Sequence, residues 1–129
     1  MKYAIIIFLM TSTLVFSQNA EQKRKVMLGR RWAEVQLKKA LNEKNDAKII
    51  IGEKAKPLND SVAAVEAAEK ILFKTYGKEN IEKQKPYQIY LINNYWILFG
   101  SLPEDSLGGT FLIILDKRDS RVLKMEHGK

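Results

Sequence analysis

The sequence contains no cysteine and a single histidine, His127. Without cysteine the chain can form no disulfide framework, no thiolate nucleophile and no sulfur-rich zinc site. One imidazole supplies too few ligands for a histidine-based metal cluster. The seven glycines never form a phosphate-binding loop pattern, and no segment carries four or more like charges in a row. These absences exclude most of the readily recognised enzyme classes, and they leave the apolar core to hold the fold together.

The 129 residues supply enough apolar side chains for one domain. Hydrophobic residues make up 46% of the chain, and 22 Lys and Arg residues exceed 15 Asp and Glu residues. The sequence shows no internal repeat, no linker and no second domain. We therefore expect a single basic domain, and composition alone does not identify its function.

Residues 1–17 have the pattern of a secretory signal peptide. Lys2 precedes an apolar stretch, and Val15 and Ser17 place modest side chains where signal peptidase would cleave before Gln18. A membrane anchor is the alternative, but a spanning helix needs about 20 predominantly apolar residues, and hydroxyl side chains interrupt this shorter stretch. We therefore expect an exported, periplasmic protein that has no stable membrane span after cleavage.

Cleavage there would leave 21 basic and 15 acidic residues, because Lys2 is the only charge in the removed segment, and the net charge would be +6. An exported protein of this charge can meet anionic lipid head groups, acidic polysaccharide or an acidic protein. Nucleic acid is not an expected partner outside the cytoplasm. Solubility explains the charge equally well, because the lysines are scattered along the chain.

Residues 18–58 are predicted to form an N-terminal helical extension that begins with a polar lead-in. Val26–Leu41 contains good helix formers with apolar residues spaced by three and four, which predicts a helix whose start Gly29 weakens. A polar stop follows at Asn42–Asp46, and Ala47–Gly52 is predicted to be a short β-rich stretch before the next helix.

A second helix is predicted from about residue 61 to Tyr76. Asn59, Asp60 or Ser61 can cap its first amides, and Gly77 stands where a left-handed cap is needed at its end. Lysines gather near its carboxyl end, where the helix dipole favours positive charge. One face of this helix is apolar and carries Val62, Val65, Ala68, Leu72 and Tyr76.

Four antiparallel strands are predicted after Gly77. Asn93-Asn94 is a two-residue turn, since Asn accepts positive φ, and it would join strands at Tyr87–Ile92 and Tyr95–Phe99. Thr110–Leu115 is a strand that is apolar on both faces, and it follows a loop at residues 103–109. The turn Asp116–Ser120 would lead into an edge strand, Arg121–His127.

Helices followed by strands indicate an α+β fold with residues 59–129 as its helix-and-sheet domain. We expect the N-terminal helices to pack on one face of a curved antiparallel four-stranded sheet. This arrangement is common to cystatin-like and nuclear-transport-factor-2-like folds.

Residues 60–129 also resemble a known bacterial family in the type and spacing of a set of individual residues. The matching residues are Tyr76-Gly77, Ile81, Gln84, Pro86-Tyr87, Trp96, Gly100, Leu102-Pro103, Gly108-Gly109-Thr110-Phe111 and His127-Gly128-Lys129. This pattern is similar to the nuclear-transport-factor-2 fold immunity proteins of bacterial polymorphic toxin systems, which include members described as YbbC/YhhH-like. The resemblance implies a cone-shaped fold and a protein that neutralises a toxin. Combined with the signal peptide, it implies immunity outside the cytoplasm.

The aromatic residues of the predicted hairpin are candidates for partner binding. Trp96 stands between apolar neighbours on its strand, so we interpret it as mainly structural while keeping it as a candidate. Tyr87 and Tyr90 would lie on opposite faces of their strand, so only one of them can point into the covered side.

Glu104 and Asp105 place negative charge in an exposed loop and are further candidates for contact with a partner. His127 is another candidate. A catalytic dyad with Glu126 is geometrically poor, because adjacent strand residues point to opposite faces, so an acid–base role would require partners from elsewhere. Asp116 and Asp119 are interpreted as turn residues and not as a metal site. We therefore expect no catalytic, cofactor-binding or metal site in this sequence.

Two further glycine positions have structural interpretations. Gly108-Gly109 lacks the helix and the Lys-Ser or Lys-Thr pair of a phosphate cradle, so we interpret it as a bend where a strand begins. Gly100 is interpreted as relief of crowding where its strand curves.

Our first functional hypothesis is an exported immunity protein that binds its toxin without catalysis, through the open face of the sheet and its loops. The alternative is a small-ligand-binding or enzymatic periplasmic protein that uses a pocket between helix and sheet, lined by Tyr90, Tyr95 and His127. A third interpretation is a cystatin-like protease inhibitor or a structural protein associated with the cell wall.

Overall fold

A computed structural model of the protein describes residues 28–43, 56–103 and 108–128. Three predicted segments lie outside the described residues: the signal peptide, the polar lead-in and the β-rich stretch at 47–52. Residues 53–55 of the predicted N-terminal extension also lie outside them. The α+β class with a four-stranded antiparallel sheet is confirmed. The elements are α1 (Gly29–Asn42), α2 (Ser61–Tyr76), α3 (Lys78–Glu82), β1 (Gln88–Ile92), β2 (Tyr95–Phe99), β3 (Phe111–Asp116) and β4 (Val122–His127).

Helix α2 begins and ends where its sequence predicts. The Asp60 side chain accepts a hydrogen bond from the backbone N–H of Ala63 at 2.8 Å, which satisfies one of the free amides of the first turn. At the other end Gly77 has a φ of 90° and donates its N–H to Phe73 O at 2.9 Å. Gly77 accepts this conformation because it has no Cβ.

The sheet is a simple meander with the order β1-β2-β3-β4. Ile92 pairs with Tyr95 across the Asn93-Asn94 turn, and both asparagines have positive φ values, of 51° and 38°. The predicted two-residue hairpin is therefore confirmed. At the β3–β4 turn, Asp116 Oδ1 accepts the backbone N–H of Arg118 at 2.9 Å, which confirms the interpretation of Asp116 as a turn residue.

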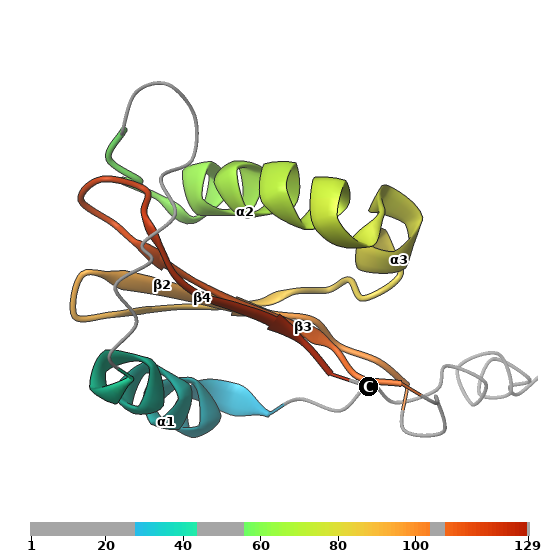
Figure 1. Ribbon diagram of the computed structural model, residues 1–129, viewed down its shortest axis with the longest axis horizontal. Coiled ribbons are helices and arrows are strands. Elements are labelled where there is room, and N and C mark those ends of the chain that lie inside the picture. The colour runs from blue at the N-terminus through green and yellow to red at the C-terminus, as the bar shows by residue number, and fades with distance from the viewer. Residues whose placement is uncertain (1–27, 44–55, 104–107, 129) are drawn as a thin grey trace, which may run out of the picture.

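The two long helices lie on opposite faces of the sheet, with α2 above it and α1 below it in Figure 1. On the α2 side, buried residues of the helix pack against Leu98, Ile113 and Leu115. On the α1 side, Ala33, Leu37 and Ala40 form a second core with Ile97, Phe99, Leu112 and Ile114. The prediction that both helices pack on one face is therefore wrong. So is the expectation of an open sheet face, because α1 covers it.

The physical reason lies in β3, whose six residues are all buried. A strand that is apolar on both faces needs a cover on each side. The periodicity of a helix identifies its apolar stripe but does not reveal which face of the sheet receives that stripe.

The short helix α3 was not predicted. It has five residues, too few for a periodic pattern to stand out, and it begins directly after the turn at Gly77. Ile81 is its single buried residue and contributes to the core on the α2 side. Gln84, two residues after α3, bonds to the backbone of Phe111, so α3 lies beside the start of β3.

We expect the second core to make a large contribution to stability. Leu37 is 3% exposed and Leu41 is 50% exposed on the same helix. Leu37→Ala should lower the free energy of unfolding by about 2–5 kcal/mol, whereas Leu41→Ala should change it by less than about 0.5 kcal/mol. Urea denaturation followed by circular dichroism measures both. Equal losses in the two variants would contradict the packing of α1 on the sheet.

Candidate functional site

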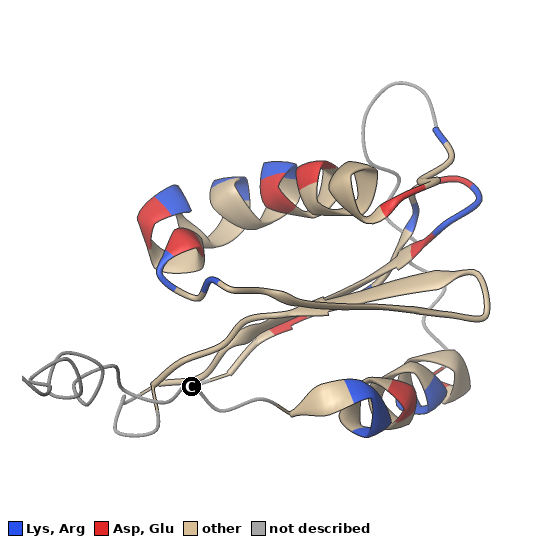
Figure 2. Cartoon of the chain, turned by 180° about the vertical axis from the view of Figure 1, so that it is seen from behind, with Lys and Arg blue, Asp and Glu red and all other residues tan. Residues whose placement is uncertain are grey.

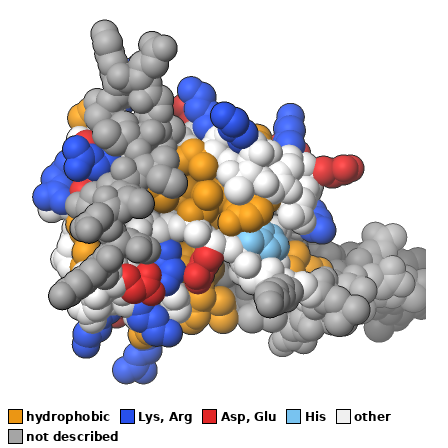
Figure 3. Space-filling view, viewed as in Figure 1, with side chains coloured by type: hydrophobic (Ala, Val, Ile, Leu, Met, Phe, Trp, Pro, Cys, Tyr) orange, Lys and Arg blue, Asp and Glu red, His pale blue; other side chains and the backbone are white. Residues whose placement is uncertain are grey.

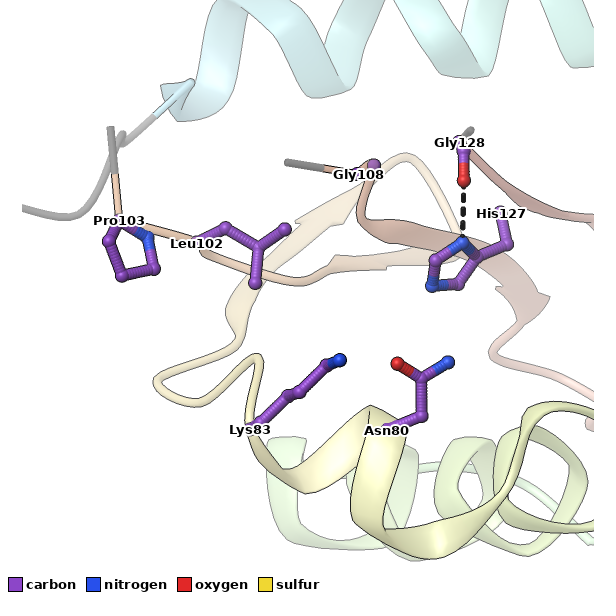
Figure 4. Close-up of a pocket in the computed structure, with 8 residues that line it drawn as sticks. Asn80, Lys83, Leu102, Pro103, Gly108, His127 and Gly128 are labelled. Atoms are coloured by element: carbon purple, nitrogen blue, oxygen red, sulfur yellow. Dashed lines mark hydrogen bonds between the residues drawn. The ribbon is translucent and has the colours of Figure 1, made fainter. Parts of the chain in front are cut away.

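A pocket of about 370 Å³ opens where β4 ends beside α3. Asn80 and Lys83 reach into it from α3 and from the turn that follows, and they face His127 and Leu102 across the opening (Figure 4). Figure 3 shows the single histidine, in pale blue, at the surface beside hydrophobic side chains. The pocket is lined by Asn80, Lys83, Leu102, Pro103, Gly108, Gly109, His127 and Gly128.

The fully buried side chain of Gln84 holds the wall of the pocket together. Its Nε2 donates hydrogen bonds to Asn80 O at 3.1 Å and to His127 Nε2 at 3.0 Å. Its Oε1 accepts the backbone N–H of Phe111 at 2.9 Å. One amide therefore joins α3, the start of β3 and the end of β4, and all of its polar atoms have partners, as burial requires.

These contacts also determine the state of the imidazole. Because Gln84 Oε1 accepts from Phe111, its Nε2 must be the donor to His127, and His127 Nε2 must be an acceptor. The ring proton then lies on Nδ1, which donates to Gly128 O at 2.7 Å. Both ring nitrogens are engaged within the chain. The imidazole is therefore arranged as a structural group and not as a free general base.

Tyr76 packs against the imidazole from α2, with the two ring centroids 5.1 Å apart. Burial, and then the negative charge of Glu126, raise the pKa of the Tyr76 phenol. The phenol of Tyr76 is therefore neutral at physiological pH.

Two close contacts in this region require glycine, one beside Gln84 and one between Gly109 and Gly128. A Cβ added to Gly100 would lie 2.7 Å from Gln84 Cβ, so only glycine leaves room for the buried amide. A Cβ added to Gly128 would lie 2.9 Å from Gly109 Cα, which shows how closely the two segments cross. Gly109 thus allows a close backbone approach beside the start of β3, and Gly108 before it adopts a positive φ of 109°.

The tyrosines Tyr87 and Tyr90 lie on opposite faces of the sheet, as predicted. Tyr87 packs edge-on against Phe111 at 5.2 Å and donates its hydroxyl to Glu69 Oε2 at 3.1 Å. Tyr90 stacks on Phe99 at 5.9 Å, on the side covered by α1. Both rings are half-buried and stay candidates for partial contact with a partner.

Trp96 lies in the core, in agreement with its interpretation as mainly structural. It is 7% exposed, and its indole N–H is donated to Leu58 O at 2.8 Å. It therefore offers no surface to a partner. Glu104 and Asp105 lie outside the described residues, and their role stays a prediction.

The structure does not bring Tyr90, Tyr95 and His127 together, so the predicted pocket lined by these three residues is wrong. Tyr90 and Tyr95 pack on the α1 side. His127 pairs with Phe111, whose side chain belongs to the core on the α2 side. The actual pocket uses Asn80 and Lys83 instead. Asn80 was missed because α3 was missed, and only the family-like spacing pointed to Gln84.

The pocket exposes polar groups that can contact a partner. Within residues 28–43, 56–103 and 108–128, no group of three or more His, Asp or Glu residues could hold a metal ion. No helix in this part of the chain is long and apolar enough to cross a membrane. The pocket offers the Lys83 ammonium, the Asn80 amide and glycine backbone, which can bind polar or acidic groups of a partner.

Comparisons with known proteins identify one matching family and two relatives. A family model described as NTF2 fold immunity protein matches residues 63–129. The uncharacterized protein YhhH of Escherichia coli strain K12 is 34% identical over 73 residues, which are 56% of this chain and 58% of YhhH. The uncharacterized protein YbbC of the same strain is 34% identical over 67 residues, which are 51% of this chain and 55% of YbbC. No solved structure matches.

The chain therefore spans a little over half the length of the curated relatives it matches. The family match includes every residue that lines the pocket, and it leaves out α1.

The crowding between Gly100 and Gln84 predicts a non-additive pair of substitutions. Gly100→Ala should destabilise the protein by about 1–3 kcal/mol, because its methyl group meets the buried amide. In a Gln84→Gly background, which removes the Cβ as well as the amide, the same change should cost less, with a coupling energy of about 0.5–3 kcal/mol. A double-mutant cycle in urea measures this coupling. Simple additivity would show that the two residues do not compete for space.

The raised pKa of the Tyr87 phenol predicts that the free energy of unfolding falls at alkaline pH. Burial, and then the charge and hydrogen bond of Glu69, raise the pKa of its phenol above the ordinary value of 10.0. The folded state holds this proton more tightly than the unfolded chain, so the contribution is complete below pH 10 and declines as the pH rises above it. Tyr87→Phe should therefore lose less stability between about pH 8 and about pH 11 than the wild type.

Urea denaturation at the two pH values tests this expectation. Tyr90→Phe, which removes a phenol from the opposite face of the sheet, is the matched control. An unchanged alkaline loss in Tyr87→Phe would contradict the assignment.

Proposed function

The chain belongs to the family of NTF2 fold immunity proteins, and from this membership we propose that it is an exported protein that binds a cognate toxin and neutralises it without catalysis. The observation that carries the proposal is the family match, which runs from α2 through β4. The toxin would belong to a polymorphic toxin system and would be made by the same or a neighbouring cell.

The geometry supports inhibition by occlusion. Both nitrogens of the only imidazole are engaged by Gln84 and Gly128, so this group has no lone pair available for a substrate. An interface of about 800 Å² on each partner would suffice to cover a toxin's active surface. The excess of basic residues would accelerate association with an acidic toxin.

The signal-peptide pattern of residues 1–17 supports export. An inhibitor must share a compartment with its target, so the toxin would act outside the cytoplasm, on the cell wall or the membrane. The periplasm is the proposed location.

A periplasmic small-ligand-binding protein is the second candidate function, and the pocket beside Asn80 and Lys83 is the observation that favours it. A metabolite that fills this pocket should raise the unfolding temperature of the purified protein. Lys83→Ala should abolish that rise if the ligand is anionic.

Toxin rescue tests the proposed function. Cells that export the toxin encoded beside this gene should survive when the full chain is expressed and should die when residues 2–17 are deleted. A foreign signal peptide fused to residue 18 should restore survival, because it restores the compartment. Rescue by the chain without any signal would refute the periplasmic location. A purified chain that does not bind the toxin would refute the immunity function.

A further inference from the structure

The backbone hydrogen bonds of β2 determine which groups of the neighbouring strands are free. Gly100, just after β2, donates its N–H to Phe111 O on the β3 side at 3.2 Å. In an antiparallel ladder the direction of the backbone groups alternates along the strand. Positions of the opposite parity in β2, such as Ile97, therefore bond to β1.

The same alternation assigns the groups of β1. Tyr90 pairs with Ile97, so its N–H and C=O point into the sheet. Ile89 and Leu91 consequently direct their N–H and C=O groups away from the sheet. β1 is an outer strand, and no described strand pairs with this edge.

The two edges of the sheet differ in how they are protected. Natural proteins guard edge strands with charged residues or bulges, because a free edge can pair with another chain. β4 carries Lys124 and Glu126, and its register shifts between Ile114 and Leu115. β1 has neither device, since residues 86–103 contain no charged residue. Figure 2 shows the β1–β2 hairpin entirely in tan, whereas the β3–β4 turn carries red and blue.

The β1 edge is also apolar at its centre. Leu91 is a large hydrophobic side chain with 37% of its surface exposed, and Ile89 beside it is only partly buried. An incoming strand would cover both side chains while it paired with their backbone groups. Main-chain pairing supplies affinity in this mode of recognition, and the alternating side chains supply specificity.

We propose that an extended segment of the toxin pairs with the outer edge of β1 and forms a fifth strand of the sheet, an inference that rests on the proposed function. Charge favours this occupant over a second copy of the chain, because each copy would still carry a net charge of +6 after cleavage of the signal peptide. Lys83 stands before β1. The segment should therefore be apolar at its centre and acidic at the flank that meets Lys83.

Amide hydrogen exchange, measured by NMR on the exported chain alone and with its toxin, tests the proposal. The amides of Ile89 and Leu91 should exchange rapidly in the free protein and at least tenfold more slowly in the complex. The amide of Tyr90 should be protected in both states, because it already pairs with Ile97.

Each other outcome refutes the edge proposal in a distinguishable way. Protection of Ile89 and Leu91 in the free monomer would show that the chain covers its own edge. Protection that grows with concentration, together with a doubled mass, would identify a second copy as the occupant. Toxin binding without added protection would refute the edge contact and leave the immunity function intact. Absence of any toxin binding would refute both.

Substitutions give a second readout. Leu91→Pro removes an outward N–H without removing a ladder bond to β2, and Leu91→Lys places a guarding charge on the edge while the amide remains. Both should weaken toxin binding at least tenfold. Met125→Pro is the matched control, since Gly128 donates to Thr110 O at 3.0 Å and Met125 therefore points outward from the β4 edge.

Circular dichroism establishes that each variant is folded, and Leu91→Lys keeps the test decisive if Leu91→Pro does not fold. Normal toxin binding by a folded Leu91 variant would refute the proposal. So would an equal loss in Met125→Pro.

Discussion

The fold depends on the complete burial of β3. All six of its residues are removed from water, and they lie between α2 on one face and α1 on the other. Burial of apolar surface is the main favourable term in folding, and a chain without cysteine has no covalent crosslink to supplement it. Because both faces of the sheet are covered, backbone groups can meet a partner only at the edges and in the loops. The surfaces at which backbone groups remain accessible to a partner therefore follow from the packing of one strand.

The sequence predicts those features whose causes are local. The capping carboxylate of Asp60, the left-handed Gly77 and the Asn93-Asn94 turn each act within a few residues, and each appears in the structure where the pattern indicates. The face on which α1 packs is a long-range choice, because its apolar stripe would fit either side of the sheet. Helix α3 was missed for a related reason: five residues anchored by Ile81 gain their stability from tertiary contacts.

The candidate site likewise combines features that the sequence reveals with features that depend on long-range contacts. The residues that carry the family resemblance are far apart in the sequence, yet Gly100, Phe111 and His127 meet around the buried amide of Gln84. Their spacing could be recognised from the sequence, but their common purpose could not, because it depends on hydrogen bonds between three separate elements. Among the four partner-binding candidates that lie in the described part of the chain, only Trp96 is placed wholly inside the core. An aromatic on a strand carries no local signal that tells a core position from a surface one.

Helix α1 lies outside the residues that match the family, although it completes the second core. The matched residues thus determine the pocket, the meander and both sheet edges, while the outer surface of the molecule on this side comes from a separate stretch of sequence. Substitutions on the solvent-facing side of α1 can accumulate without disturbing Gln84 or the β1 edge. One exterior surface of the molecule can therefore change in shape and charge while the matched scaffold stays as it is.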